Sequence, residues 1–287
     1  MKTAEKKLTA IFGAALIILM ALSSTAYAIT NGQPDGAAHP YVGMVVVWDG
    51  VSDYVYLGTG SLIAPKVVLT AGHVTADTPD YIIAYVYVSF DPVVSWPPPP
   101  FGPGPWPDWE VASDWYTHPD YEIGTAPQLK NWISHDVGII ILDEPVVMGA
   151  YGELPEEGLV DRLEMMTPVD QVGYGVQGMF HVPGTGPPDW SWVEMGARYY
   201  APAQLVKSKH VFSDEFIKTT ANPAQGKGGT AFGDSGGPVL QGGTDTILAV
   251  TSWGTNYQCA GVSYAARVDT ADVLDWIDSE FGGYLPP

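Results

Sequence analysis

The sequence has a single cysteine and few basic side chains. Cys259 is the only cysteine among 287 residues, so no disulfide can form within the chain and packing must supply the stability of the fold. A catalytic thiol needs a partner histidine in an electropositive setting, and nothing in the sequence around Cys259 suggests one. We therefore expect this thiol to be structural. Twelve Lys and Arg stand against 32 Asp and Glu, a formal net charge of −20, and such a surface repels nucleic acid and anionic membranes.

Long amphipathic stretches are also missing. Hydrophobic residues make up 46% of the chain, which is enough to bury the core of one large lobe or two small ones. The 33 Gly, 25 Pro, 16 Tyr and 10 Trp favour many short strands joined by tight turns over a helical bundle. An all-β fold is predicted.

The first 28 residues differ in kind from the rest. Three lysines precede an apolar run at 8–22, and small residues follow up to Ala28. This pattern is typical of a secretory signal peptide, and the run is shorter than the roughly 20 apolar residues of a spanning helix. We expect cleavage after Ala28, an extracellular protein and no stable membrane association afterwards. Removal of three Lys and one Glu leaves nine basic and 31 acidic residues, a formal charge of −22.

Runs of β-branched and aromatic residues recur along the mature chain. Segments 42–48 and 54–57 flank an Asp-Gly turn and are predicted to pair. Further strands are predicted at 67–69, 81–89, 137–142, 171–174, 204–208, 247–253 and 262–268. Near the end, apolar residues at helical spacing predict a helix after Thr270 that stops at Gly282-Gly283.

Segment 92–109 stands apart because it contains four consecutive prolines among Trp, Phe and Gly. Such a composition forbids ladder pairing and favours polyproline geometry, so an exposed loop is predicted. Its interpretation as a tolerated insertion and its interpretation as an aromatic wall near a cleft both remain open.

The sharpest local signal is the run GDSGGP at 233–238, which sets Ser235 among glycines. Glycines let the backbone turn tightly and leave its amides free to hold an oxyanion. A serine hydroxyl is a poor nucleophile at neutral pH, so catalysis demands an imidazole to take its proton and a carboxylate to orient that imidazole. His73 follows an apolar strand among small residues, and Asp136 opens the apolar run 136–142, where a buried carboxylate needs a partner.

The same run satisfies Gly-x-Ser-x-Gly, the nucleophile elbow of α/β-hydrolases. Those enzymes place the acid and then the histidine after the serine. No base follows Ser235 here, since the last histidine is His210. The order His73, Asp136, Ser235 therefore argues against an esterase or lipase of that fold.

Four segments in this order resemble signatures of the trypsin and chymotrypsin family. They are TAGH at 70–73, DVGI at 136–139, GDSGGP at 233–238 and SWG at 252–254, with supporting matches at 60–63, 173–175 and 276–277. The resemblance covers nearly all of residues 29–281, the expected protease domain, and leaves a short tail at 282–287.

This resemblance implies an all-β chymotrypsin-like fold, with two packed six-stranded antiparallel β-barrels, a boundary near 150–170 and a C-terminal helix. It also implies a serine endopeptidase acting through an acyl-enzyme. Ser235 would attack the scissile carbonyl, His73 would take its proton, and Asp136 would fix the imidazole tautomer. The amides of Gly233 and Ser235 would form the oxyanion hole.

The family pattern also assigns substrate-binding residues. Ser252 would hydrogen-bond Asp136, and Trp253 and Gly254 would pair with an extended substrate backbone. The pocket floor would fall at Gly229, with Thr230 beside it. The absence of an acid there predicts a preference for aromatic or aliphatic residues before the scissile bond.

Gly254 and Gly261 match the two pocket-wall glycines of the family. Extra residues after Gly261 leave tryptic specificity open as an alternative, because an alignment slip of one or two residues would change the pocket floor. Ala231 stands where a disulfide cysteine is usual, which leaves Cys259 unpaired.

Cleavage after Ala28 would expose a terminus beginning Ile29-Thr30-Asn31-Gly32, which is similar to the family's activated Ile-Val-Gly-Gly start. In that family the freed ammonium pairs with the aspartate before the nucleophile, here Asp234. We therefore expect export itself to activate the enzyme.

A catalytically silent homologue that binds ligands through the same cleft is the main alternative. Such a protein is expected to lack a triad member, and this chain has all three. We expect polypeptide substrates, no metal or organic cofactor, and a monomer, with calcium binding by acidic loops left open.

Overall fold

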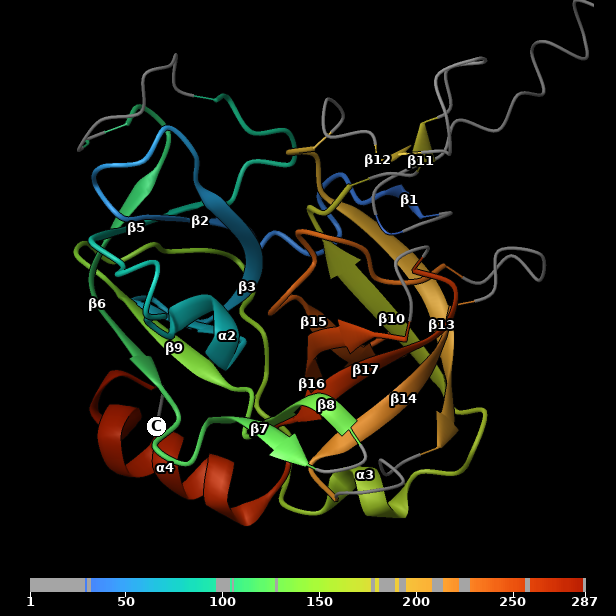
Figure 1. Ribbon diagram of the computed structural model, residues 1–287. Helices are drawn as coiled ribbons and strands as arrows, with labels where there is room; N and C mark the ends of the chain where they lie inside the picture. The colour runs from blue at the N-terminus through green and yellow to red at the C-terminus, as the bar shows by residue number, and fades with distance from the viewer. Residues whose placement is uncertain are drawn as a thin grey trace, which may run out of the picture.

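Two groups of antiparallel strands, each closed on itself, lie side by side in the computed structural model (Figure 1). The structure describes residues 29, 32–96, 104, 106–126, 129–176, 179–180, 189–190, 195–207, 214–221, 228–255 and 259–285. The predicted signal peptide, 1–28, lies outside the described residues.

The first barrel closes in the order β2-β3-β4-β9-β6-β5. Its strands are β2 (Val42–Trp48), β3 (Tyr56–Ala64), β4 (Val67–Thr70), β5 (Tyr85–Ser89), β6 (Glu110–Thr117) and β9 (Gly138–Leu142). Every residue of β2, β4 and β9 is buried, as the valine- and isoleucine-rich sequences of these strands predict.

The second barrel follows the order β13-β10-β15-β16-β17-β14, and β14 pairs back with β13 to close the ring. Its strands are β10 (Pro168–Gly173), β13 (Tyr199–Lys207), β14 (Phe216–Ala221), β15 (Pro238–Gln241), β16 (Ile247–Gly254) and β17 (Gly261–Arg267), with β1 (Gln33–Pro34) added at β13. The predicted fold of two six-stranded antiparallel barrels is confirmed.

Within the described ranges, two short hairpins stand outside the barrels. They are β7 (Glu122–Ala126) with β8 (Leu129–Ser134), and β11 (Met179–Phe180) with β12 (Asp189–Trp190). The short helices are α2 (Gly72–Thr75) and α3 (Leu159–Arg162).

A buried arginine ties the two barrels together. Arg198 is 2% exposed, and its guanidinium donates to Asp35 Oδ2 at 2.8 Å, to the carbonyl of Val42 at 3.0 Å and to Tyr174 Oη at 3.1 Å. A buried cation is tolerated only when its donors are satisfied, so this network fixes the first strand of one barrel against the segment that follows β10 of the other.

The C-terminal helix α4 (Ala271–Phe281) leaves the second barrel and returns to the first, where it lies along the lower edge (Figure 1). Its buried face, Val273, Ile277 and Phe281, joins the core of the first barrel. The predicted helix after Thr270 is confirmed, and the α-helix ends directly before Gly282-Gly283 as predicted. A 3-10 turn, η3 (Gly282–Tyr284), follows it. In the part of the chain that is described, no helix is long and apolar enough to cross a membrane.

The prediction of an exposed loop at 92–109 holds for Trp96, which is 38% exposed, and is wrong for Trp106 and Trp109. Trp106 and Trp109 are 7% and 6% exposed, and the Trp106 ring stacks on Tyr87 with centroids 4.0 Å apart. Their large apolar surfaces are buried against the first barrel, which offsets the lack of ladder pairing. Residues 97–103 and 105 lie outside the described part of this segment.

Candidate active site

His73 and Asp136 meet at the edge of the first barrel. Helix α2 begins directly after β4 and carries His73, whereas Asp136 lies just before β9, the strand that pairs with β4. His73 Nδ1 lies 2.9 Å from Asp136 Oδ2 and 3.1 Å from Oδ1, and the main-chain N–H of His73 donates to Oδ1 at 2.8 Å. Ser252, on β16 of the second barrel, donates its hydroxyl to Oδ2. Residues of both barrels therefore hydrogen-bond to the same carboxylate, that of Asp136, which is fully buried.

The protonation of this pair follows from its surroundings. Burial favours the neutral form of Asp136, but His73 and the hydroxyl of Ser252 outweigh it and hold the pKa of Asp136 below its usual value. Burial acts to lower the pKa of His73, whereas the Asp136 carboxylate raises it, and the net pKa lies above its usual value. With Nδ1 donating to Asp136, the neutral ring presents Nε2 as a proton acceptor.

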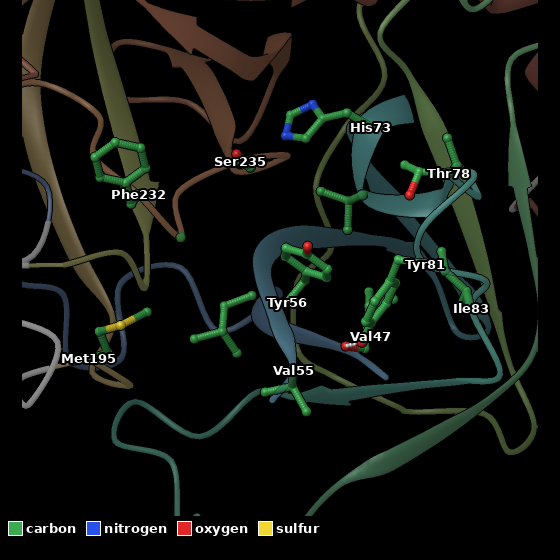
Figure 2. A pocket seen from close by; sticks show the side chains of 14 residues that line it. Val47, Val55, Tyr56, His73, Thr78, Tyr81, Ile83, Met195, Phe232 and Ser235 are labelled. Atoms are coloured by element: carbon green, nitrogen blue, oxygen red, sulfur yellow. Dashed lines mark hydrogen bonds between the residues drawn. The ribbon is translucent and has the colours of Figure 1, made fainter. Parts of the chain in front are cut away.

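Ser235 lines the same cavity as His73. Figure 2 shows the imidazole and the serine together on one side of that cavity, which has a volume of about 620 Å³. Ser235 Oγ makes no hydrogen bond to any residue that the structure describes, and it shares the cavity with the imidazole of His73. Hydrogen bonds between nucleophile and base are often long without substrate.

A residue of the first barrel hydrogen-bonds to the turn that carries Ser235. Thr59, on β3, donates its main-chain N–H to the carbonyl of Ser235 at 2.7 Å, and its hydroxyl donates to the carbonyl of Gly233 at 2.8 Å. The Thr59 hydroxyl also accepts a bond from Tyr174 N at 3.2 Å. Gly236 has φ +81, and a Cβ there would collide with Thr70 Oγ1, so only glycine fits. Sequence reasoning did not find Thr59.

The amide of Gly233 points away from Val176. The carbonyl of Phe232 accepts a bond from Val176 N at 2.8 Å, and a trans peptide directs the Gly233 N–H the opposite way. Gly233, with φ +98, lines the cavity beside Ser235. Neither Gly233 N nor Ser235 N donates to another residue in the described ranges. Two unused amides beside a serine suit a developing oxyanion.

Asp234, between these two residues, is fully buried. Its carboxylate accepts bonds from Gly175 N at 2.8 Å and Ala231 N at 2.7 Å. Burial raises the pKa of Asp234 to about 7, although the two amides act to lower it. Within the described ranges no cationic side chain pairs with it. Ile29 is buried, and its carbonyl accepts a bond from Gly32 N at 2.6 Å.

The predicted substrate-binding residues divide into two groups. Four of them line a second cavity of about 470 Å³ together with Ser235, namely Thr230, Ser252, Trp253 and Gly254. The other two, Gly229 and Gly261, are not among the described residues that line it. Gly229 is buried so tightly that a Cβ there would collide with Ala221, and Gly261 is exposed at the start of β17 with φ +95.

Cys259 also lines this second cavity. Burial raises the pKa of its thiol to about 12, so the group is neutral at physiological pH and is a poor nucleophile. The described lining residues of this cavity include no Asp, Glu, Lys or Arg. Across the described chain, no three His, Cys, Asp or Glu side chains gather in a way that can hold a metal ion.

Comparison with known proteins gives a family match and a fold match. The family model described as Trypsin matches residues 107–277. Among solved structures, HL collagenase superposes with a TM-score of 0.59 at 17% identity, over 90% of this chain and 96% of that one. Human heparin binding protein superposes with a TM-score of 0.56 at 16% identity, over 89% of this chain and 98% of that one. At such identities the structural likeness establishes the fold.

Proposed function

The chain belongs to the trypsin family, and on that premise we propose that it is a secreted serine endopeptidase with His73, Asp136 and Ser235 as its catalytic residues. One observation carries the proposal. The buried carboxylate of Asp136 accepts bonds from His73 Nδ1 and Ser252 Oγ, which leaves Nε2 as the free base in the cavity that Ser235 lines. This is the arrangement that activates a serine hydroxyl.

In the proposed reaction, Ser235 Oγ attacks the scissile carbonyl and gives its proton to His73 Nε2. The amides of Gly233 and Ser235 stabilise the oxyanion that forms. His73 then protonates the leaving amine as the C–N bond breaks, and an acyl-enzyme on Ser235 remains. Water, deprotonated by His73, hydrolyses that ester and restores the serine.

The smaller cavity supports a preference for uncharged residues before the scissile bond. Thr230, Trp253 and Gly254 line it with Ser235, and its described lining residues carry no charge. A trypsin-like preference needs an acidic partner for the substrate's Lys or Arg, and none of those residues supplies one. Aromatic or aliphatic side chains suit the site better.

Activation through the new terminus is the second part of the proposal. Asp234 is fully buried with two main-chain amides as its described partners, so an ammonium at Ile29 would neutralise a charge that is costly to bury alone. Signal cleavage after Ala28 would supply that ammonium during export.

A silent, ligand-binding homologue is the alternative. One fold neighbour is named for binding heparin, a polyanion, but this chain carries a formal charge of −20 and does not suit such a ligand. We therefore favour an active peptidase of polypeptide substrates that works as a monomer.

Active-site labelling separates the two possibilities. The secreted protein is treated with a fluorophosphonate and digested, and the labelled peptide is identified by mass spectrometry. We expect stoichiometric labelling of Ser235 that is lost in His73→Ala, together with an N-terminus at Ile29. A protein that is folded and begins at Ile29 but takes up no label would contradict the proposed activity.

A further inference from the structure

The larger of the two cavities at Ser235 is mostly apolar. It lies on the side of the first barrel, where Val47, Val55, Tyr56, Tyr81 and Ile83 line it (Figure 2). None of the described residues that line it is Asp, Glu, Lys or Arg, in a chain with 44 such residues. An uncharged cavity of about 620 Å³ beside a nucleophile is a binding site for an apolar group.

The place of His73 decides which part of a substrate enters this cavity. His73 lines the larger cavity and is not among the described residues of the smaller one, whereas Ser235 and Phe232 line both. A general acid must lie within hydrogen-bond reach of the atom that it protonates, and here that atom is the nitrogen of the leaving amine. The leaving amine and the residues that follow it therefore lie on the His73 side.

The wall of the larger cavity is held in place before substrate arrives. Tyr81 Oη donates to the carbonyl of Val47 at 3.0 Å and accepts from Asp49 N at 3.0 Å. Thr78 and Tyr81 exchange two main-chain hydrogen bonds at 3.0 and 3.1 Å, and Ile83 N donates to Asp77 Oδ1 at 2.8 Å. A wall fixed in this way loses little entropy when a ligand binds.

Tyrosine rings form the apolar surface of this wall. Tyr81 is 5% exposed with its hydroxyl already bonded, so it offers a ligand only a small area of ring. Tyr56 meets Tyr81 edge to face with centroids 4.5 Å apart and is itself 55% exposed. Aromatic surfaces in this arrangement pack well against another ring or a branched aliphatic side chain.

We propose that this cavity binds a large apolar side chain, aromatic or leucine-like, on the leaving-group side of the scissile bond. The inference rests on the proposed function. It adds that substrate choice depends on the residues after the cleaved bond as well as on those before it.

Acyl transfer measures this site separately from acylation. The mature enzyme is acylated with a small amino-acid ester, and the acyl-enzyme partitions between water and an added amine. Phenylalaninamide, leucinamide, glycinamide and aspartamide are compared at equal concentration. We expect the first two to capture the acyl group at least about tenfold more efficiently than glycinamide, as a well-filled apolar pocket allows, and aspartamide to capture it least.

A matched pair of variants locates the effect. Val55 lines the cavity, whereas Val51 lies on the same connection, is 87% exposed and is not among the described lining residues. We expect Val55→Asp to abolish the preference for phenylalaninamide over glycinamide and to increase the capture of lysinamide. Val51→Asp adds the same charge and should keep the wild-type ratios.

The outcomes separate this inference from the proposed function. Rapid ester acylation with equal capture of all four amides would overturn the leaving-group pocket and leave the peptidase standing. Unchanged amide ratios in Val55→Asp would also overturn the pocket. No acylation at all, with a folded protein, would overturn the proposed function itself.

Discussion

The hydroxyl of Thr59, in the first barrel, donates a 2.8 Å hydrogen bond to the carbonyl of Gly233, in the second. The same residue holds the carbonyl of Ser235 through its main-chain N–H at 2.7 Å. One strand of the first barrel thus fixes both sides of the turn that carries Ser235, the proposed nucleophile.

We predict that Thr59→Val lowers kcat by about tenfold with little change in KM. The substitution keeps the shape but leaves the Gly233 carbonyl and Tyr174 N without their partner, and the oxyanion amide loses its support. Stability should fall by about 1–3 kcal/mol, the usual cost of unsatisfied buried groups. Steady-state kinetics and urea unfolding measure both effects. Thr59→Ser keeps the hydroxyl and should restore kcat, and equal kcat in the valine and serine variants would contradict this role.

A second prediction concerns Gly236, which combines a left-handed backbone with a crowded site. Gly236→Ala would place a Cβ 2.5 Å from the carbonyl oxygen of Thr59, and it should abolish activity and destabilise the fold by several kcal/mol. Gly243→Ala is the matched control, because Gly243 has φ +74 with nothing within 4 Å of the added atom. It should cost only about 1–2 kcal/mol and leave kcat unchanged. Equal losses in the two variants would show that the packing against Thr59 is unimportant.

The pH dependence of stability should report the state of Asp234. Without a cation the pKa of Asp234 is about 7, so the folded protein binds a proton that the unfolded chain releases near pH 3.8. The contribution of Asp234 to the stability of the precursor is then greatest below pH 3.8 and is lost as the pH rises to about 7. In the mature form the proposed ammonium of Ile29 should remove most of that fall.

Urea unfolding at pH 5 and pH 8 tests this prediction on the mature protein and on a precursor that keeps residues 1–28. Asp234→Asn in the precursor removes the titrating group and serves as the control. If precursor and mature protein lose equal stability between the two pH values, the ion pair does not form.

At acid pH, the dependence of peptidase activity on pH should follow the protonation of His73. His73 must be neutral to accept the proton of Ser235, and the Asp136 carboxylate raises its pKa above the ordinary value of about 6.5. We predict that kcat/KM falls as the pH drops through this raised pKa. Asp136→Asn should move this fall to lower pH and reduce kcat by about 10⁴. A fall that does not move in this variant would rule out His73 as the titrating base.

The sequence predicts strands best where buried β-branched residues run without interruption. Strand β2 matches the expected 42–48 because all seven of its residues are buried. Strand β14 was missed because Lys218 and three polar or small residues break its apolar run, although burial alternates from Ile217 onward. Strand β15 was missed because it has four residues and begins at Pro238.

Some residues of the candidate site could be predicted from the sequence and others could not. His73, Asp136 and Ser235 lie in short sequence motifs that can be recognised without a structure. Thr59 contacts Gly233 from 174 positions away, and a threonine inside a strand has no local signature of such a contact. The larger cavity at Ser235 was missed for the same reason, because Val55 and Tyr81 become one surface only when the barrel closes.

Peptide hydrolysis by Ser235→Ala, His73→Ala and the double variant tests the central claim most directly. Groups that act as one unit do not contribute additively, so each variant should lose at least about 10³ in kcat and the double variant no more than the worse single one. Proteolysis by the folded Ser235→Ala protein at the wild-type rate would contradict the account.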